Sequence, residues 1–337
     1  MTGSSCDGCA MVKTRFQLLT SSLKTLVYQS LLFAVSLLPT RLAFRIARSV
    51  GGYAYRRRRV SAQQRQVAIE RTLDVRPGEA ARLVRRSFEL AACDDLDYWL
   101  YRSASQRKLD HLIDIQGLEN LDSVLSLGRG AILCSGHLNG LFLFLVALSG
   151  RGYKLNVVRR PPSKVSLSVD GWFNERRTLI SGRAACNFLW MHPTNFGIAV
   201  QASNALRRNE IVLMLLDPRV PTNRVVVNFF NQPTSFPSGH VLIAQTSGAP
   251  LLDFFIHRSR DLSRLHVKIC RPLHVSDDTN DTLSAVTHFV SRLEHHIRRD
   301  PGSWSRWSRP EYFSTDLDPT RQIQEPSRFS IQANSDG

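Results

Sequence analysis

Hydrophobic positions in the middle of the chain alternate between short unbroken runs and longer periodic stretches. Short apolar runs bounded by small or polar residues predict buried strands, and apolar residues spaced three or four apart predict helices. The predicted strands are residues 113–115, 131–134, 155–158, 211–216, 225–230, 251–256 and 265–269. The predicted helices are residues 119–127, the stretch from 138, 194–206, 240–247 and 283–299. This alternation predicts an α/β fold with a mixed, largely parallel sheet flanked by helices.

The N-terminal part of the chain follows a helical pattern instead. Residues 77–101 predict one long helix, with Pro77 near its start. Residues 18–38 are the most apolar N-terminal segment, but polar residues interrupt it before it reaches the roughly 20 apolar residues of a spanning helix. Basic residues precede this segment as in a signal peptide, yet no cleavage-site pattern follows it. We expect an uncleaved apolar helix that lies in or docks on a membrane; a soluble core helix is the alternative.

Composition and periodicity divide the chain into four segments. With 337 residues, the protein is long enough for one large domain or two smaller ones. Both ends are polar and lack periodicity, so we expect a disordered leader at residues 1–15 and a disordered tail at 314–337. Between them we expect a membrane-associating helical segment at 16–60 and the α/β domain at 61–313.

The net charge of the chain indicates which classes of binding partner to expect. There are 44 Lys and Arg residues against 28 Asp and Glu, a net charge of +16, which points to nucleic acid, an anionic membrane or an acidic carrier. No zinc finger or RNP motif is present, so nucleic acid is not expected. The run Arg56 to Arg59 follows the apolar segment, a position that favours contact with lipid phosphates. Of six scattered cysteines only Cys6 and Cys9 are close, which fits a reducing compartment rather than a zinc site or disulfide framework.

A histidine stands at the junction between a predicted strand and a predicted helix. Ser135, Gly136 and His137 follow the strand 131–134. Backbone N–H groups at the start of a helix have no partner within it, so such a histidine is well placed as a base toward an anionic or acyl substrate. The alternative is a histidine that only bonds nearby backbone. A covalent intermediate on Cys134 or Ser135 is also conceivable, although a free cysteine usually packs in the core.

Two sets of acidic residues are further candidates for a functional site. Asp217 ends the strand 211–216, and open α/β sheets place their sites at strand ends, although an Asp before Pro218 often makes only a local turn bond. Asp94, Asp95 and Asp97 lie near the end of the helix 77–101, where the helix dipole disfavours them. We expect them to have a partner such as the arginine-rich segment, since a metal site would need further ligands.

Several segments occur in the order and spacing of a known family. They are residues 51–53, 131–137, 159–161, 172–177, 213–217, 227–233, 237–239, 246–251 and 298–304, with Trp307 and Arg309. On these segments, roughly from residue 31 to 312, the chain resembles the lysophospholipid acyltransferase superfamily, in particular the lipid A late (lauroyl or myristoyl) acyltransferases. The resemblance implies transfer of a fatty acyl group from an acyl-carrier-protein or coenzyme A thioester to a hydroxyl or amine of a lipid or lipid-like acceptor. It implies no metal or redox cofactor, and a place at the cytoplasmic face of the inner membrane, either peripheral or held by a single N-terminal anchor.

The family signature is a histidine followed after four residues by Asp or Glu, and this sequence departs from it. The resemblance implies that His137 is the general base and that a carboxylate orients it. The position of that carboxylate holds Phe142, which cannot accept a hydrogen bond from an imidazole. Three alternatives stay open. Asp217, or else Asn139 or a backbone carbonyl, orients the base; or the chemistry survives by proximity to an activated thioester; or the protein only binds lipid or a partner.

The resemblance also implies substrate contacts. Arg159 and Arg177 match family arginines that contact substrate phosphate, for which a bidentate guanidinium is suited; the alternative is surface charge. Asn139 and Gly239 complete the predicted substrate-binding set. For His240, a second base is conceivable, but a capping or exposed role is favoured. The basic chain suits both an acidic carrier protein and a membrane surface with anionic lipid.

Overall fold

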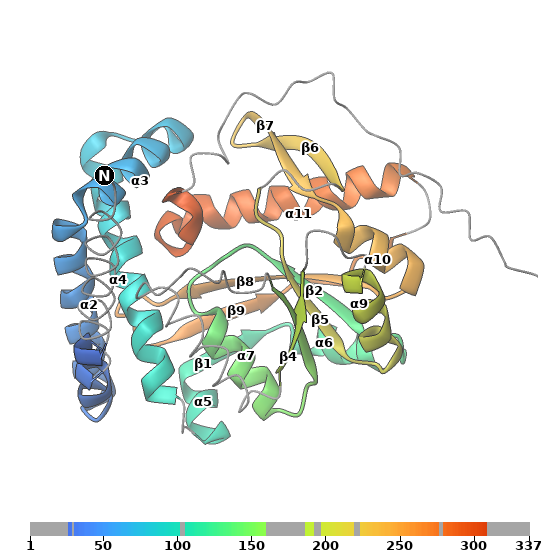
Figure 1. Ribbon diagram of the computed structural model, residues 1–337, viewed down its shortest axis with the longest axis horizontal. Coiled ribbons are helices and arrows are strands. Elements are labelled where there is room, and N and C mark those ends of the chain that lie inside the picture. Colours follow the sequence, from blue (N-terminus) through green and yellow to red (C-terminus); the bar gives the residue numbers. More distant parts are fainter. Residues whose placement is uncertain are drawn as a thin grey trace, which may run out of the picture.

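The computed structural model of the 337-residue protein describes residues 26–28, 30–101, 105–159, 186–191, 197–218, 223–275 and 279–308 (Figure 1). The helices are α2 (Thr40–Arg57), α3 (Arg59–Leu73), α4 (Pro77–Tyr101), α5 (Gln106–Leu112), α6 (Leu118–Leu125), α7 (Leu141–Gly150), α9 (Gly197–Arg207), α10 (Gly239–Ser247) and α11 (Thr279–Arg299). The strands are β1 (Ile113–Gln116), β2 (Ala131–Ser135), β3 (Leu155–Arg159), β4 (Cys186–Trp190), β5 (Ile211–Leu215), β6 (Arg224–Phe229), β7 (Gln232–Pro237), β8 (Leu251–Arg258) and β9 (Leu265–Ile269). Two short 3₁₀ helices, η2 (Pro301–Ser303) and η3 (Ser305–Ser308), follow α11.

A seven-stranded sheet in the order β1-β9-β8-β2-β5-β3-β4 forms the centre of the fold. The five strands from β8 to β4 are parallel to their neighbours. β9 pairs antiparallel with β8, and β1 pairs parallel with β9, so these two strands run the opposite way. The prediction of a mixed, largely parallel sheet is therefore confirmed. β6 and β7 form a separate antiparallel hairpin.

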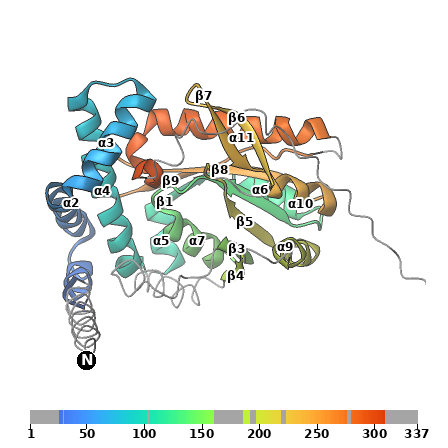
Figure 2. The same ribbon diagram turned by 45° about the horizontal axis from the view of Figure 1, so that its top comes forward.

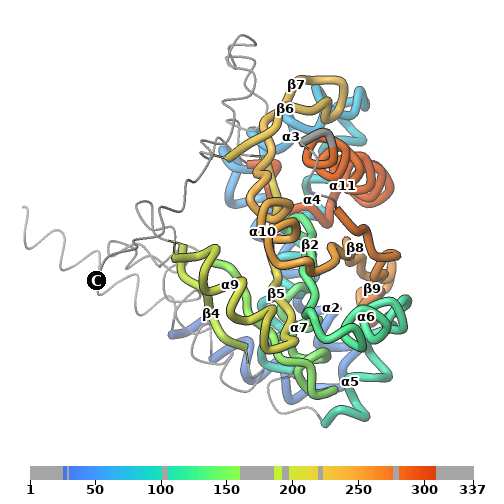
Figure 3. The backbone as a smooth tube through the Cα atoms, turned by 90° about the vertical axis from the view of Figure 1, so that its right-hand side faces the viewer, coloured from blue at the N-terminus to red at the C-terminus, as the bar shows by residue number. Residues whose placement is uncertain are grey.

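Helices cover both faces of this sheet. Figure 2 shows α11 along one face and α5 and α7 along the other. Every residue of β2 is buried, as the unbroken apolar run 131–134 requires of a strand that is covered on both sides. Figure 3 shows the same layers from the side of α9 and α10, with the β6–β7 hairpin next to α11.

The N-terminal helices pack against one another beside the sheet. α2 lies so close to α4 that a Cβ on Gly51 would come within 2.5 Å of the Glu89 backbone. Before α2, residues 26–28 and 30–36 are helical. Large apolar side chains are exposed on this stretch and its continuation into α2: Leu26, Val27, Leu31, Phe33, Leu37, Leu38 and Leu42. In the described part of the chain no helix is both long and apolar enough to cross a bilayer. Association of this segment with a membrane therefore stays a prediction, and the expected leader at 1–15 and tail at 314–337 lie outside the described residues.

Four of the α-helices and strands were not predicted, and one helix begins later than expected. β7 contains Pro233 and Pro237, which are typical of a loop. α3 is rich in Arg and Gln and buries only Ala62 and Ile69, so it shows almost no apolar periodicity. The short elements α5 and β4 were missed as well. α7 begins at Leu141 rather than at residue 138, because Gly140 before it has a φ of 90° and makes a turn.

Candidate active site

The carboxyl ends of β2 and β5 bring His137 and Asp217 together. The two strands are parallel neighbours in which Ser135 is level with Leu215, and the Leu216 N–H donates to the Ser135 carbonyl at 2.7 Å. His137 and Asp217 each lie two residues beyond these paired strand ends. Nδ1 of His137 bonds to the Asp217 carboxylate, and the His137 backbone N–H donates to both carboxylate oxygens, at 3.1 and 3.2 Å. The backbone N–H that the sequence suggested would be free for a substrate is thus used inside the protein.

This carboxylate is ionised at neutral pH. Burial acts to raise its pKa, because the Asp217 side chain is only 2% exposed. The charge of His137 and the hydrogen bonds that it donates, together with the charge of Arg306, outweigh burial and hold the pKa of Asp217 at about 2. A carboxylate on Nδ1 fixes the proton there and leaves Nε2 as the proton acceptor. The His137 side chain is 33% exposed, and none of the described residues bonds to Nε2.

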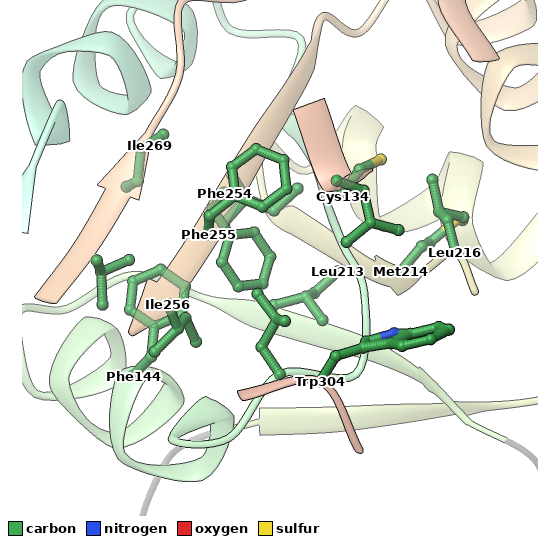
Figure 4. Close-up of a cluster of buried hydrophobic side chains, with 14 of the residues drawn as sticks. Cys134, Phe144, Leu213, Met214, Leu216, Phe254, Phe255, Ile256, Ile269 and Trp304 are labelled. Atoms are coloured by element: carbon green, nitrogen blue, oxygen red, sulfur yellow. The ribbon is translucent and has the colours of Figure 1, made fainter. Parts of the chain in front are cut away.

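The segment after α11 contacts the His137–Asp217 pair and stabilises its position. The Trp304 indole is fully buried and donates to Oδ1 of Asp217 at 2.8 Å. Trp304 also forms a β-bridge with Leu138, and the Ser305 N–H and hydroxyl both donate to the His137 carbonyl at 3.0 Å. Figure 4 shows the Trp304 ring in the same buried cluster as Leu213 and Met214 of β5. The sequence included Trp304 in a motif segment but gave no sign of this role.

Gly136 allows α11 to approach the turn that carries His137. A Cβ at this position would lie 2.8 Å from the Leu293 side chain and 3.5 Å from the Asp217 carboxylate. A larger residue would therefore force the Leu293 side chain of α11 to shift.

Phe142 occupies the signature position of the missing carboxylate. It lies in the first turn of α7, and its ring packs on that of Tyr98 in α4, with 5.6 Å between the centroids. The carboxylate that meets the imidazole comes from Asp217 instead. Of the three alternatives, this geometry favours the one in which Asp217 orients His137.

Asn139 is bonded inside the protein. It is 8% exposed, its side-chain amide donates to Asp94 at 2.8 Å, and its backbone N–H donates to the Ser303 carbonyl at 2.9 Å. These bonds hold the turn after His137, and substrate contact by Asn139 stays a prediction.

The acidic cluster at the end of α4 has a different partner from the expected one. Arg258 of β8 is 2% exposed; it pairs with Asp97 and lies 3.7 Å from Asp94. Asp95 accepts a hydrogen bond from the Tyr28 hydroxyl at 3.2 Å. The prediction that the arginine-rich segment pairs with this cluster is therefore wrong. The described residues contain no group of three side chains suited to hold a metal ion.

Two of the predicted substrate-binding residues lie at the same edge of the sheet as His137. Arg159 ends β3 and is level with Ser135 of β2. The two strands are separated by β5, so their backbones lie about 10 Å apart. The Arg159 guanidinium stacks on the Phe188 ring, 5.2 Å from its centroid. Gly239 begins α10, which runs back to the start of β8, so its N-terminus lies near the carboxyl ends of the strands. A Cβ on Gly239 would meet no atom within 4 Å. Arg177 lies outside the described residues.

The other nucleophile and base candidates are buried. Cys134 is 1% exposed, and burial raises the pKa of its thiol well above the usual value, which disfavours a thiolate nucleophile. Ser135 is fully buried in β2. His240 is also buried, so the expectation that it is exposed is wrong, and burial lowers its pKa to about 3. His240 is therefore neutral at pH 7.

Comparisons with known proteins show which family this chain is similar to. The family model of bacterial lipid A biosynthesis acyltransferases matches residues 11–309. A phosphatidylinositol mannoside acyltransferase of Mycobacterium tuberculosis (strain ATCC 25618 / H37Rv) is 26% identical over 244 residues, which cover 68% of this chain and 71% of that protein. The protein of the same description from strain CDC 1551 / Oshkosh has the same identity and coverage.

Proposed function

Since the chain belongs to the bacterial lipid A biosynthesis acyltransferase family and is an acyltransferase, we propose that His137 is the general base of its acyl transfer. The acyl group moves from a thioester donor to a hydroxyl or amine of a lipid or lipid-like acceptor. The observation that carries this proposal is the contact between His137 Nδ1 and the buried, ionised carboxylate of Asp217.

The proposed steps follow from this geometry. Asp217 holds the proton of His137 on Nδ1, and Nε2 takes the proton of the acceptor hydroxyl or amine as that group attacks the thioester carbonyl. The imidazolium that forms is stabilised by the ionised Asp217 carboxylate. Collapse of the tetrahedral intermediate breaks the carbon–sulfur bond, and the proton on Nε2 passes to the departing sulfur. The product is an ester or amide of the acceptor, and His137 returns to its starting state.

The donor, the acceptor and the location are proposed from charge and from the relatives. The net charge of +16 suits the acidic surface of an acyl carrier protein, with acyl-coenzyme A as the other donor. Lipid A and phosphatidylinositol mannoside, named by the family and the relative, are both glycolipids, which supports a glycolipid acceptor. The exposed apolar side chains between Leu26 and Leu42, with Arg41 and Arg45 beside them, support peripheral binding to anionic lipid at the cytoplasmic face of the inner membrane.

A second candidate is a lipid-binding or scaffold protein of the same fold that has lost catalysis. Phe142 favours it, because the signature carboxylate is missing. The carboxylate of Asp217 on His137 favours the enzyme, because it supplies the same orienting group from another strand.

An acyl-transfer assay on the detergent-solubilised full chain separates the two candidates. Labelled acyl carrier protein and acyl-coenzyme A are offered to a panel of phosphoglycolipids, lysophospholipids and amines. The variant His137→Ala tests the base, and His111→Ala, at an exposed position of α5, is the matched control. Transfer that is lost only in His137→Ala supports the enzyme. Vesicle binding with no transfer to any acceptor supports the binding protein, and full activity of His137→Ala contradicts the proposed base.

A further inference from the structure

Arg306 lies in the short helix η3, which contacts the turn that carries the proposed base. It lies between Ser305, which donates twice to the His137 carbonyl, and the buried Trp307. Arg306 as a whole is partly exposed to solvent, but its Nε atom is buried. Arg306 therefore places a positive charge at the boundary between the protein interior and solvent.

Within the part of the chain that the structure describes, the Arg306 guanidinium has no partner, which distinguishes it from Arg258 and Arg292. Arg258 pairs with Asp97, and Arg292 donates to Asp253 at 3.0 Å. Arg306 forms no hydrogen bond or ion pair with any described residue, and its Nε finds no acceptor there. Burial of Nε without an acceptor is unfavourable. The two terminal nitrogens of the guanidinium are not buried in this way, so they are accessible to an anion from solvent.

The carboxylate of Asp217 does not serve as the hydrogen-bond acceptor for Arg306. The positive charge of Arg306 contributes to the low pKa of Asp217, but the Asp217 oxygens are bonded by His137 and Trp304. An anion bound to Arg306 would therefore come from outside the described protein. It would lie close to the His137–Asp217 pair, because Arg306 is near enough for its charge to act on Asp217.

We propose that Arg306 is an anion-binding residue of the acyl-transfer site that holds a phosphate group of a bound substrate. This inference rests on the proposed function. The reacting thioester and hydroxyl are neutral, so phosphate is the group that a guanidinium would recognise. Its planar set of N–H donors matches two phosphate oxygens at once. The phosphate comes either from the phosphopantetheine of the donor or from the headgroup of a lipid acceptor.

The kinetics of charge variants test whether Arg306 binds a phosphate, and they identify which substrate carries it. Arg306→Gln removes the charge, and Arg306→Lys keeps the charge without the planar set of N–H donors. Arg129→Gln is the matched control. Arg129 is exposed in the loop before β2, at the opposite edge of the sheet from His137. We expect Arg306→Gln to raise the KM of one substrate by about 10- to 100-fold, Arg306→Lys to recover part of this loss, and Arg129→Gln to match the wild type. A raised donor KM assigns the phosphopantetheine phosphate, and a raised acceptor KM assigns the headgroup phosphate.

Direct binding keeps the test independent of turnover. Calorimetry compares 4′-phosphopantetheine with pantetheine, and glycerophosphoinositol with inositol, on the wild type, Arg306→Gln and His137→Ala. We expect the preference for one phosphorylated compound in the wild type and in His137→Ala, and its loss in Arg306→Gln. This result would support the anion site even if no acyl transfer were detected. Unchanged KM values for both substrates in Arg306→Gln, or phosphate preference retained in that variant, would overturn the proposal.

Discussion

The imidazole of His137 bonds through Nδ1 to the carboxylate of Asp217, 80 positions further along the chain. The signature of the family places the acidic residue in the helix after the histidine, whereas here it comes from the end of the neighbouring strand β5. The same edge of the sheet thus supplies both members of the pair. The acyltransferase therefore has an orienting carboxylate for its proposed base, although the signature position holds Phe142.

Restoring the signature carboxylate will not improve the enzyme. Phe142→Asp removes the ring contact with Tyr98 and places a charge beside it, so we expect a loss of about 1–3 kcal/mol in unfolding free energy. We expect no gain in kcat/KM, because Asp217 already holds Nδ1 of His137. Thermal unfolding and transfer assays of Phe142→Asp, with Phe142→Leu as control, check both points. Recovery of activity when Phe142→Asp is added to Asp217→Asn would show that position 142 still reaches the imidazole.

Trp304 is expected to position the orienting carboxylate. Trp304→Phe keeps most of the buried ring but removes the N–H that donates to Asp217 Oδ1, a bond to a charged group worth about 1.5–3 kcal/mol. We expect kcat to fall by about tenfold with KM nearly unchanged, since Trp304 touches Asp217 rather than substrate. Trp307→Phe, which removes a bond to the Pro301 carbonyl, is the matched control. An equal loss of kcat in both variants would mean that Trp304 acts only through packing.

Asp217 makes stability depend on pH in the acid range. Its pKa is about 2 in the folded protein, below the value of about 3.9 of an unfolded Asp. The resulting stabilisation, about 2–3 kcal/mol, is fully present above the unfolded pKa and is lost as the pH falls from about 4 toward 2. Denaturant unfolding between pH 2 and 7 should show a smaller loss of stability toward low pH in Asp217→Asn than in the wild type. Parallel pH curves for the two proteins would contradict the low pKa.

The exposed apolar residues before and within α2 are expected to bind membranes. The triple variant Leu31→Ser, Leu37→Ser and Leu42→Ser removes large apolar side chains that are 44–73% exposed. We expect partition onto anionic phospholipid vesicles to fall by at least about tenfold, because this binding scales with buried apolar area. Vesicle flotation measures it, with Leu127→Ser, exposed after α6, as control. Unchanged flotation of the triple variant would place the membrane contact elsewhere.

Much of the fold could be predicted from apolar patterning. The bounds of α4 match the prediction, because Pro77 marks its start and the apolar positions repeat throughout. The central strands β2 and β5 were also found, since buried parallel strands are continuous apolar runs. β7 and α3 were missed because prolines and polar residues hide their patterns.

The site was predicted only where strand ends indicate it. Asp217 was a candidate because parallel strands end at a common edge, and the structure places it on His137. The contacts of Trp304 and the position of Arg306 depend on how the segment after α11 folds back onto the sheet. The pairing of Arg258 with Asp97, 161 positions apart, likewise has no local signal. Such contacts are set by tertiary packing rather than by the local sequence.

The most direct test of the central claim is kcat/KM for acyl transfer by Asp217→Asn at neutral pH. An amide cannot take over the charge of the carboxylate and does not fix the same imidazole tautomer, so we expect kcat/KM to fall by about 10²- to 10⁴-fold while the protein stays folded. Asp122→Asn, at an exposed position of α6, should keep wild-type kinetics. Wild-type kinetics in Asp217→Asn would contradict the account, since His137 would then act without the carboxylate that the fold places on it.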